Sequence, residues 1–161
     1  MVRVSILGST GYTGAELVRI LSTHPFCELT YLGSQSYAGQ SFTDVFSHLH
    51  GLVDKECGEH DVDQAVAASD VIFVALPHGH SAPVVGEAVS RGRKVIDLGA
   101  DFRFRDPRIY EQWYGVKHGQ PSLLDRAVYG LPELRRPEVK GAEIVANPGC
   151  YPTGAVLALA P

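Results

Sequence analysis

The sequence predicts an α/β fold, a doubly wound parallel sheet, and three observations support this. A glycine-rich turn joins a first strand to a first helix at the start of the chain. Apolar runs of strand length then alternate with helical patterns, which is the order typical of parallel sheets. The run 70–76 is almost wholly apolar, as expected for a central strand covered on both faces.

Composition indicates an ordinary globular domain. The chain has 161 residues, 45% of them hydrophobic, a formal net charge of −4 and a pI of about 5.9. This balance gives no reason to expect a nucleic-acid or membrane partner, and no apolar run reaches the about 18 residues of a membrane span. The start of the chain has no signal-peptide pattern. Cys27, Cys57 and Cys150 are odd in number and widely spaced, which argues against a disulfide framework and favours a reducing, cytoplasmic setting.

The first strand, 2–7, leads through a glycine turn into a helix predicted over 15–21. Gly8 permits a tight exit from the strand, Gly11 allows close approach of a pyrophosphate, and Gly14 allows the helix to pack on the strand. The spacing G-x-x-G-x-x-G is a variant of the dinucleotide fingerprint, in its usual strand–turn–helix context. The turn therefore predicts an NAD(P)-binding Rossmann domain. The expected cofactor contacts here are Gly8, Ser9, Thr10, Gly11, Tyr12, Thr13 and Gly14.

The end of the second strand, 27–32, bears on the choice of cofactor. An NAD-selective fold usually places an acid there, on the ribose 2′-hydroxyl. No acid follows this strand, and Ser34 and Ser36 could hydrogen-bond a 2′-phosphate. The sequence therefore favours NADP (NADPH), although the arginine often found at this point is missing too. Cys27 fits the strand pattern, and we expect it to pack in the core.

Residues 40–60 show no regular pattern. His48 and His50 form an H-x-H pair, and Cys57 and His60 follow. A zinc site would need more ligands at suitable spacing. We therefore expect no metal, and instead a solvated loop or hydrogen-bonded structural histidines.

Two further strands end in polar or glycine-rich turns. A helix over 61–69 precedes the strand 70–76, and a helix over 82–91, opened by Ser81 or His80, precedes the strand 93–99. Ligands of doubly wound sheets bind at the carboxyl ends of the strands. Pro77 and His78 are therefore candidate cofactor contacts, although a loop histidine is more often structural.

The next segment contains a candidate anion-binding residue. Arg103 follows a strand end, where its guanidinium could bind phosphate or carboxylate, or could belong to a solvated charged loop. We expect a short helix over 107–114 and an ordered loop excursion with short turns over 115–142. The last strand is expected over 143–146.

Cys150 lies on the turn 147–153, between that strand and an apolar helical run. N–H groups at a helix N-terminus favour the thiolate and an oxyanion forming beside it. A buried, inert cysteine is the alternative, but the Pro-Gly turn before Cys150 favours a nucleophile. A reactive cysteine beside a nicotinamide suits reduction of an acyl phosphate to an aldehyde.

Five motifs, taken in order along the chain, resemble the N-acetyl-γ-glutamyl-phosphate reductase family of arginine biosynthesis, a semialdehyde dehydrogenase family. They lie at 8–17, 76–81, 99–103, 129–134 and 148–153. The resemblance implies an NADP-binding Rossmann domain followed by an α+β catalytic and dimerisation domain. It implies that Cys150 is the nucleophile, and we expect Arg103 and Asn147 to bind the substrate.

Family members are considerably longer than this chain and form homo-oligomers, and their catalytic histidine lies beyond the nucleophile. We therefore expect 1–148 to be the Rossmann domain and 149–161 to begin a truncated catalytic domain. The apolar run at the end agrees with a piece of a longer enzyme, which alone would bind NADPH weakly and turn over nothing. Two alternatives stay open: the paralogous aminoadipyl-phosphate reductase of lysine biosynthesis, and a nucleotide-binding module without chemistry.

Overall fold

Six strands form a single sheet in the computed structural model, which describes residues 1–160. Their order is β2-β1-β3-β4-β6-β5, and every neighbouring pair is parallel. The chain leaves β1 towards β2 and then returns to the other side of β1, so the strand order reverses between β1 and β3. The predicted doubly wound sheet is thereby confirmed. The strands are β1 (Val2–Leu7), β2 (Cys27–Gly33), β3 (Val71–Val74), β4 (Lys94–Asp97), β5 (Ala127–Tyr129) and β6 (Ile144–Ala146).

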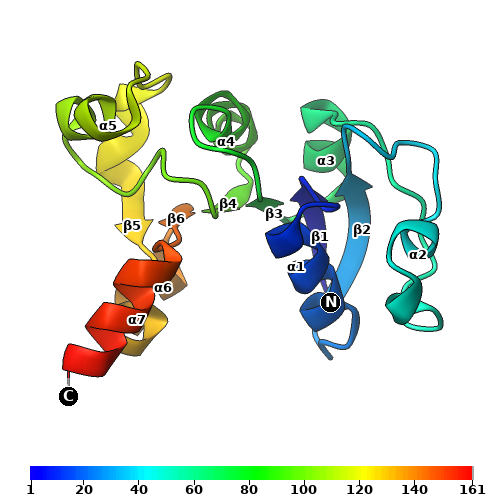
Figure 1. Ribbon diagram of the computed structural model, residues 1–161. Helices are drawn as coiled ribbons and strands as arrows, with labels where there is room; N and C mark the ends of the chain where they lie inside the picture. The colour runs from blue at the N-terminus through cyan, green and yellow to red at the C-terminus, as the bar shows by residue number, and fades with distance from the viewer. Residues whose placement is uncertain (161) are drawn as a thin grey trace.

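Helices cover both faces of the sheet (Figure 1). One face carries α3, α4 and α5, and the other carries α1, α6 and α7, with α2 beside the β2 edge. The α-helices are α1 (Tyr12–Ser22), α2 (Phe42–Val45), α3 (Val62–Ala68), α4 (Ser81–Ser90), α5 (Pro107–Tyr114), α6 (Pro132–Gly141) and α7 (Cys150–Leu159). Two 3₁₀ turns, η1 (Ser47–Leu49) and η2 (Pro121–Arg126), complete the described elements.

The core is divided in two by the sheet, and β3 illustrates how. Its fully buried Ile72 and Val74 belong to the cluster formed with α3 and α4. Its half-buried Val71 and Phe73 pack against the second cluster, which includes Val18 of α1. Successive strand side chains point to opposite faces, so a continuous apolar run supplies both layers.

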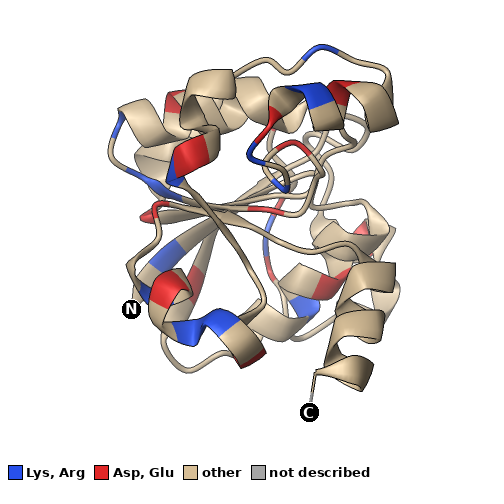
Figure 2. Ribbon diagram, turned by 90° about the vertical axis from the view of Figure 1, so that its left-hand side faces the viewer, with Lys and Arg blue, Asp and Glu red and all other residues tan. Residues whose placement is uncertain are grey.

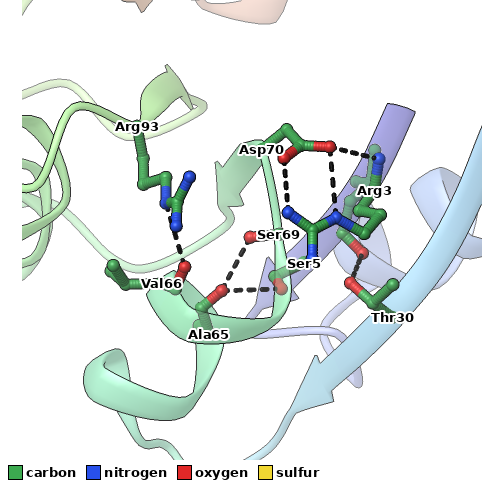
Figure 3. A network of polar contacts seen from close by, with 9 residues as sticks. Arg3, Ser5, Thr30, Ala65, Val66, Ser69, Asp70 and Arg93 are labelled. Carbon is green, nitrogen blue, oxygen red and sulfur yellow. Dashed lines mark hydrogen bonds and ion pairs between the residues drawn. The ribbon is translucent and has the colours of Figure 1, made fainter. Parts of the chain in front are cut away.

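Polar contacts tie the turn before β3 to the start of β1 (Figure 3). Arg3 pairs with Asp70 at 2.7 Å, and its backbone N–H also donates to that carboxylate at 3.0 Å. Two hydroxyls, of Ser5 and Ser69, donate to the Ala65 carbonyl at 3.1 and 2.6 Å. Both hydroxyls are buried, and these bonds satisfy them at the end of the sheet away from the glycine turn.

Two regions differ from the sequence-based expectation. The prediction of a loop excursion over 115–142 is wrong, because this segment contains η2, the edge strand β5 and the helix α6. The strand is only three residues long, and α6 contains Pro137 and a non-helical residue at Arg135, so neither has a clear pattern. The first helix also begins earlier than predicted, at Tyr12, so that Gly14 lies inside it.

The last helix is apolar and exposed. No residue of α7 is charged, as Figure 2 shows, and none of its residues is buried. Leu159 and Tyr151 are among its most exposed side chains. None of the helices in the described part of the chain combines the length and the apolar character needed to cross a membrane.

Candidate functional site

The glycine turn after β1 is closely packed at two positions and open at the third. Gly8 has a φ of +83°, and a Cβ there would lie 2.3 Å from the Ala75 carbonyl oxygen. A Cβ on Gly14 would lie 2.1 Å from the Gly8 carbonyl oxygen. These values agree with the tight strand exit predicted at Gly8 and with the close helix–strand packing predicted at Gly14. A Cβ on Gly11 would meet only the Gly8 carbonyl oxygen, at 3.5 Å, so Gly11 leaves space on its outer side.

The N-terminus of α1 faces outward without a protein cap. Its N-cap is Gly11, which offers no side-chain hydrogen bond, and no acidic residue lies in the first turn. The first N–H groups of a helix lack partners within the helix and attract anions. This arrangement fits a dinucleotide pyrophosphate.

A cleft of about 640 Å³ lies beside this turn, where the strand order reverses. Of the predicted cofactor contacts, Gly8, Thr10, Gly11, Ser36 and Pro77 line it. Residues that sequence reasoning did not assign to the cofactor also line it, and no Asp or Glu does. These further residues are Gln35, His60, Ala75, Leu76 and His80.

The other predicted contacts lie outside the cleft walls. Ser9 is buried, and its hydroxyl donates to the Gly33 carbonyl at 3.1 Å. Ser34 is also buried: its Oγ lies 2.7 Å from the Thr10 hydroxyl and accepts the Tyr37 N–H at 3.2 Å. The two serines therefore brace the turns that line the cleft. Tyr12 is fully exposed at the start of α1, Thr13 is exposed beside it, and Gly14 is buried.

A second pocket, of about 200 Å³, adjoins the cleft at Leu76, which lines both. It brings together His78, Arg103 and Tyr114, with the strand end at 98–100. The rings of His78 and Tyr114 lie 5.1 Å apart. The predicted convergence of the turns after β3 and β4 is thus observed, and Tyr114 joins them from α5.

Asp101 connects these turns below the surface. It is buried, and its Oδ1 accepts hydrogen bonds from the Gly79 N–H at 2.8 Å and the Tyr110 hydroxyl at 2.9 Å. Its Oδ2 accepts the Ala82 N–H at 3.0 Å, in the first turn of α4. Burial and the contact with Asp101 raise the pKa of Tyr110 above its ordinary value. One carboxylate therefore holds the 77–80 turn, the start of α4 and α5 together.

The side chain of His118 hydrogen-bonds to the backbone of Asp101. The buried His118 accepts the Gln120 N–H on Nδ1 at 3.1 Å, so its proton lies on Nε2. From Nε2 it donates to the Asp101 carbonyl oxygen at 2.6 Å. Its ring also packs edge-on against Tyr110 and Phe102. We interpret His118 as a structural residue, since the protein occupies both of its ring nitrogens.

A second buried carboxyl group, that of Asp97, lies at the end of β4. Its Oδ1 accepts the Gly99 N–H at 2.9 Å, whereas its Oδ2 and the nearby Ser81 hydroxyl have no hydrogen-bond partner. Burial raises the pKa of Asp97 to about 6, and the Gly99 N–H offsets part of that rise. A Cβ on Gly99 would lie 2.6 Å from the Ser81 Oγ, so that hydroxyl would have to move to accept a side chain there.

The turn before Cys150 packs against the side chain of Arg103. The Arg103 Nε donates to the Asn147 carbonyl at 2.9 Å, and its Nη2 donates to the Leu98 carbonyl at 3.0 Å. A Cβ on Gly149 would lie 3.1 Å from the Arg103 Nη1, so the turn before the cysteine packs closely on this guanidinium. Cys150 is exposed, as the first residue of α7. Cys150 thus lies at a helix N-terminus, directly after a turn that contacts Arg103 and at the same edge of the sheet as the cleft.

The other cysteines lie apart from this edge. Cys57 is buried and Cys27 is half-buried in the core, as expected for Cys27, and burial raises the pKa of both thiols. In residues 1–160, no three His, Cys, Asp or Glu side chains form a group that could hold a metal ion. His48 and His50 are exposed and lie outside the cleft.

The sequence pattern gives only a weak signal that His60, His80 and Tyr114 belong to the site. His60 was weighed only as a metal ligand or structural histidine, because the bridge that brings it beside β2 pairs single residues, Gly33 and Gly58. His80 could be located only as a helix start. The aromatic pattern of 107–114 located the helix but not the face on which Tyr114 meets His78.

Comparisons with known proteins give the relatives of this chain. The family model described as "Semialdehyde dehydrogenase, NAD binding domain" matches residues 3–142. The N-acetyl-gamma-glutamyl-phosphate reductase of Pelotomaculum thermopropionicum is 60% identical over 99% of this chain. That of Desulforudis audaxviator is 56% identical over 100% of it. The chain spans 46% of the length of each of these two relatives.

Solved structures share the fold at low identity. Aspartate semialdehyde dehydrogenase from Candida albicans, solved with NADP, has a TM-score of 0.70 and 19% identity, over 99% of this chain and 46% of that one. The Vibrio cholerae aspartate semialdehyde dehydrogenase II has a TM-score of 0.71 and 19% identity, over 99% and 45%. These likenesses concern the fold alone.

Proposed function

The chain belongs to the semialdehyde dehydrogenase family, whose NAD-binding domain it contains, and we propose that it forms the cofactor-binding and nucleophile-bearing part of a reductase. The proposed reaction reduces N-acetyl-γ-glutamyl phosphate with NADPH to N-acetyl-glutamate 5-semialdehyde and phosphate. The names of the relatives at 56–60% identity support this choice of substrate.

The observation that carries the proposal is the position of Cys150. It is exposed at the first residue of α7, directly after the Gly149 that packs on Arg103. Helix N–H groups and a nearby guanidinium both favour negative charge at this place. They also favour an oxyanion formed beside the sulfur. A buried structural cysteine would need none of these features.

In the proposed reaction Cys150 is the catalytic nucleophile. Its thiolate attacks the acyl carbon, and a carbon–sulfur bond forms as the bond from that carbon to the phosphate oxygen breaks. Phosphate leaves with the electron pair, so a thioester remains on the enzyme. A bound nicotinamide supplies the hydride that takes an acyl group to the aldehyde level. The sulfur then leaves again as thiolate.

The cofactor would be held at the glycine turn and along the cleft. Gly11 leaves room for the pyrophosphate, and the uncapped start of α1 supplies N–H groups to it. Ser36 and Pro77 line the cleft at the ends of β2 and β3, and His78 lines the adjoining pocket. Tyr12 and Thr13 would contribute the N–H groups of that first turn, and Ser9 and Ser34 would act by holding the turns in place.

Arg103 and Asn147 are proposed to bind the substrate as well as to support the turn. Arg103 lines the second pocket, next to the strand end at 98–100. Its Nε and Nη2 are engaged with carbonyl groups, so an anion would use its remaining N–H groups. The Asn147 side chain donates from Nδ2 to the Pro148 carbonyl at 3.1 Å. That bond holds the amide beside the nucleophile turn.

The test is reductase activity of the protein at its full natural length, with the glutamyl and the carrier-bound aminoadipyl acyl phosphates compared. Loss of activity in Cys150→Ser, together with preference for the glutamyl substrate, is the expected result. For the 161-residue chain, we expect NADPH binding without turnover. A Cys150→Ser protein that retains full activity would refute the assignment of the nucleophile.

A further inference from the structure

His60 lies in the cofactor cleft although it is far from the glycine turn in sequence. A single-residue parallel bridge pairs Gly58 with Gly33 at the end of β2. The Gly58 N–H donates to the Leu32 carbonyl, and its own carbonyl accepts the Ser34 N–H, both at 2.9 Å. The chain between α2 and α3 therefore returns beside the carboxyl end of β2 (Figure 1).

The residues on either side of His60 are anchored. The Tyr31 hydroxyl donates to the Glu59 carbonyl at 2.7 Å. Asp61 caps α3, where its carboxylate accepts the Gln64 N–H at 3.1 Å. The His60 side chain itself is exposed and makes no hydrogen bond to any residue in 1–160. Its backbone is thus held in place while its imidazole is left for a ligand.

Few other groups at this end of the cleft can bind a phosphate. No Lys or Arg lines the cleft, and the Ser34 hydroxyl is buried against Thr10 and the Tyr37 N–H. The donors that remain at the end of β2 are the side chains of Gln35, Ser36 and His60. In Rossmann folds this place faces the adenosine ribose.

We infer that His60 binds the 2′-phosphate of NADPH, together with Ser36, and selects NADPH over NADH. This inference rests on the proposed function. An imidazole N–H donates to a phosphate oxygen in either protonation state. The histidine would therefore take the place of the arginine that is absent after β2.

The charges around His60 indicate the side on which the phosphate lies. His60 also lines another pocket, separate from the two described above. Its charged residues are Glu59, Asp61, Asp63 and Glu87, with Arg91 as the basic one. Arg91 is paired with Asp63 and Glu87. Because that pocket is rich in carboxylates, an anion that reaches His60 would bind on the Ser36 side, in the cofactor cleft.

The experiment compares NADPH and NADH binding to the chain by fluorescence titration. For His60→Ala we expect the Kd for NADPH to rise about tenfold, which corresponds to about 1.4 kcal/mol, and the Kd for NADH to stay within about twofold. His60→Gln keeps a hydrogen-bond donor, so its affinity for NADPH should fall less than that of His60→Ala. The matched control is His50→Ala, also an exposed histidine but outside the cleft, which should change neither Kd.

Each other result overturns the inference. An equal loss for both cofactors in His60→Ala would mean that the imidazole contacts the adenine or the ribose, and not the 2′-phosphate. An unchanged Kd for NADPH would mean that His60 has no contact with the cofactor. If the unsubstituted chain bound neither cofactor, the proposed function would be refuted together with this inference. If the unsubstituted chain bound NADPH and only the effect of His60→Ala were missing, the inference alone would be refuted.

Discussion

The Arg103 Nε donates a hydrogen bond to the Asn147 carbonyl oxygen at 2.9 Å, and this contact joins the segment after β4 to the end of β6. The same guanidinium donates from Nη2 to the Leu98 carbonyl at 3.0 Å. The backbone also links these two strand ends, because the Asn147 N–H donates to the Asp97 carbonyl at 2.8 Å. A rigid planar fork bonds the two carbonyls through two separate nitrogens, whereas lysine offers a single nitrogen on a flexible stem.

Arg103→Lys should therefore loosen the nucleophile turn while it keeps the charge. A lysine ammonium reaches only one of the two carbonyls, so we expect the free energy of unfolding to fall by about 1–2 kcal/mol. Amide hydrogen exchange over 147–150 should also become faster. Arg105→Lys is the control, because Arg105 is exposed and makes no ion pair among the described residues. Equal urea midpoints for the two variants would contradict the bridging role.

Asp101→Asn should disturb the cleft wall through the 77–80 turn. An amide offers one oxygen, so either Ala82 or the Gly79–Tyr110 pair would face an NH₂ group instead of an acceptor. A buried donor left without a partner costs about 1–3 kcal/mol. We expect that loss of stability together with weaker NADPH binding. Tyr110→Phe removes one hydrogen bond and keeps the carboxylate, so it should cost about 1 kcal/mol or less and leave the amides of Gly79 and Ala82 protected from exchange.

The features that could be predicted from the sequence depend on neighbouring residues. The glycine turn, the central strand and the helix over 107–114 each have a signal within about ten residues. Asp106 caps that helix, with its carboxylate accepting the Arg108 N–H, and Gly115 ends it with a φ of +69°. Parallel connectivity then brings the strand ends to one edge, so the joint location of Pro77, Arg103 and Cys150 followed from topology alone.

The features that could not be predicted depend on contacts between distant segments. The edge strand β5 is recognisable only by its pairing with β6. His60 enters the cleft through one bridge between glycines, which has no periodic pattern. The sequence predicts that Arg103 binds an anion, but not that it contacts the Asn147 carbonyl, because that contact joins residues 44 positions apart.

Substitutions of Gly11 and Gly14 by alanine should separate cofactor binding from folding. Gly14→Ala places a Cβ 2.1 Å from a backbone oxygen, so helix and strand must move apart, and we expect a loss of about 3 kcal/mol or more. In Gly11→Ala the nearest atom is 3.5 Å away, so stability should change by less than about 1 kcal/mol. NADPH affinity should nevertheless fall at least about tenfold, because the methyl group occupies the space meant for the pyrophosphate. Normal NADPH binding by Gly11→Ala would refute this use of the turn.

The raised pKa of Asp97 has a defined effect on stability. Its carboxyl group is held near a pKa of about 6 in the folded chain, against 3.8 ordinarily, chiefly by burial. The folded state therefore binds this proton more tightly than the unfolded state. The stabilisation of the folded state by this proton is fully present below about pH 4, declines as the pH rises to about 6, and is absent above that. Two pKa units correspond to about 3 kcal/mol.

Asp97→Asn should remove this pH dependence. The amide oxygen can still accept the Gly99 N–H, and the NH₂ group can donate to the Ser81 hydroxyl, which now lacks a partner. We expect the variant to match the unsubstituted chain near pH 4 and to be about 1–3 kcal/mol more stable at pH 8. Other carboxyl groups, such as Asp70, whose pKa is lowered to about 2 by Arg3, titrate in both proteins and cancel in the difference. Urea unfolding at several pH values measures that difference, with the exposed Asp125→Asn as control. If the difference in the free energy of unfolding stayed constant between pH 4 and pH 8, the ionisation of Asp97 would have no effect on stability.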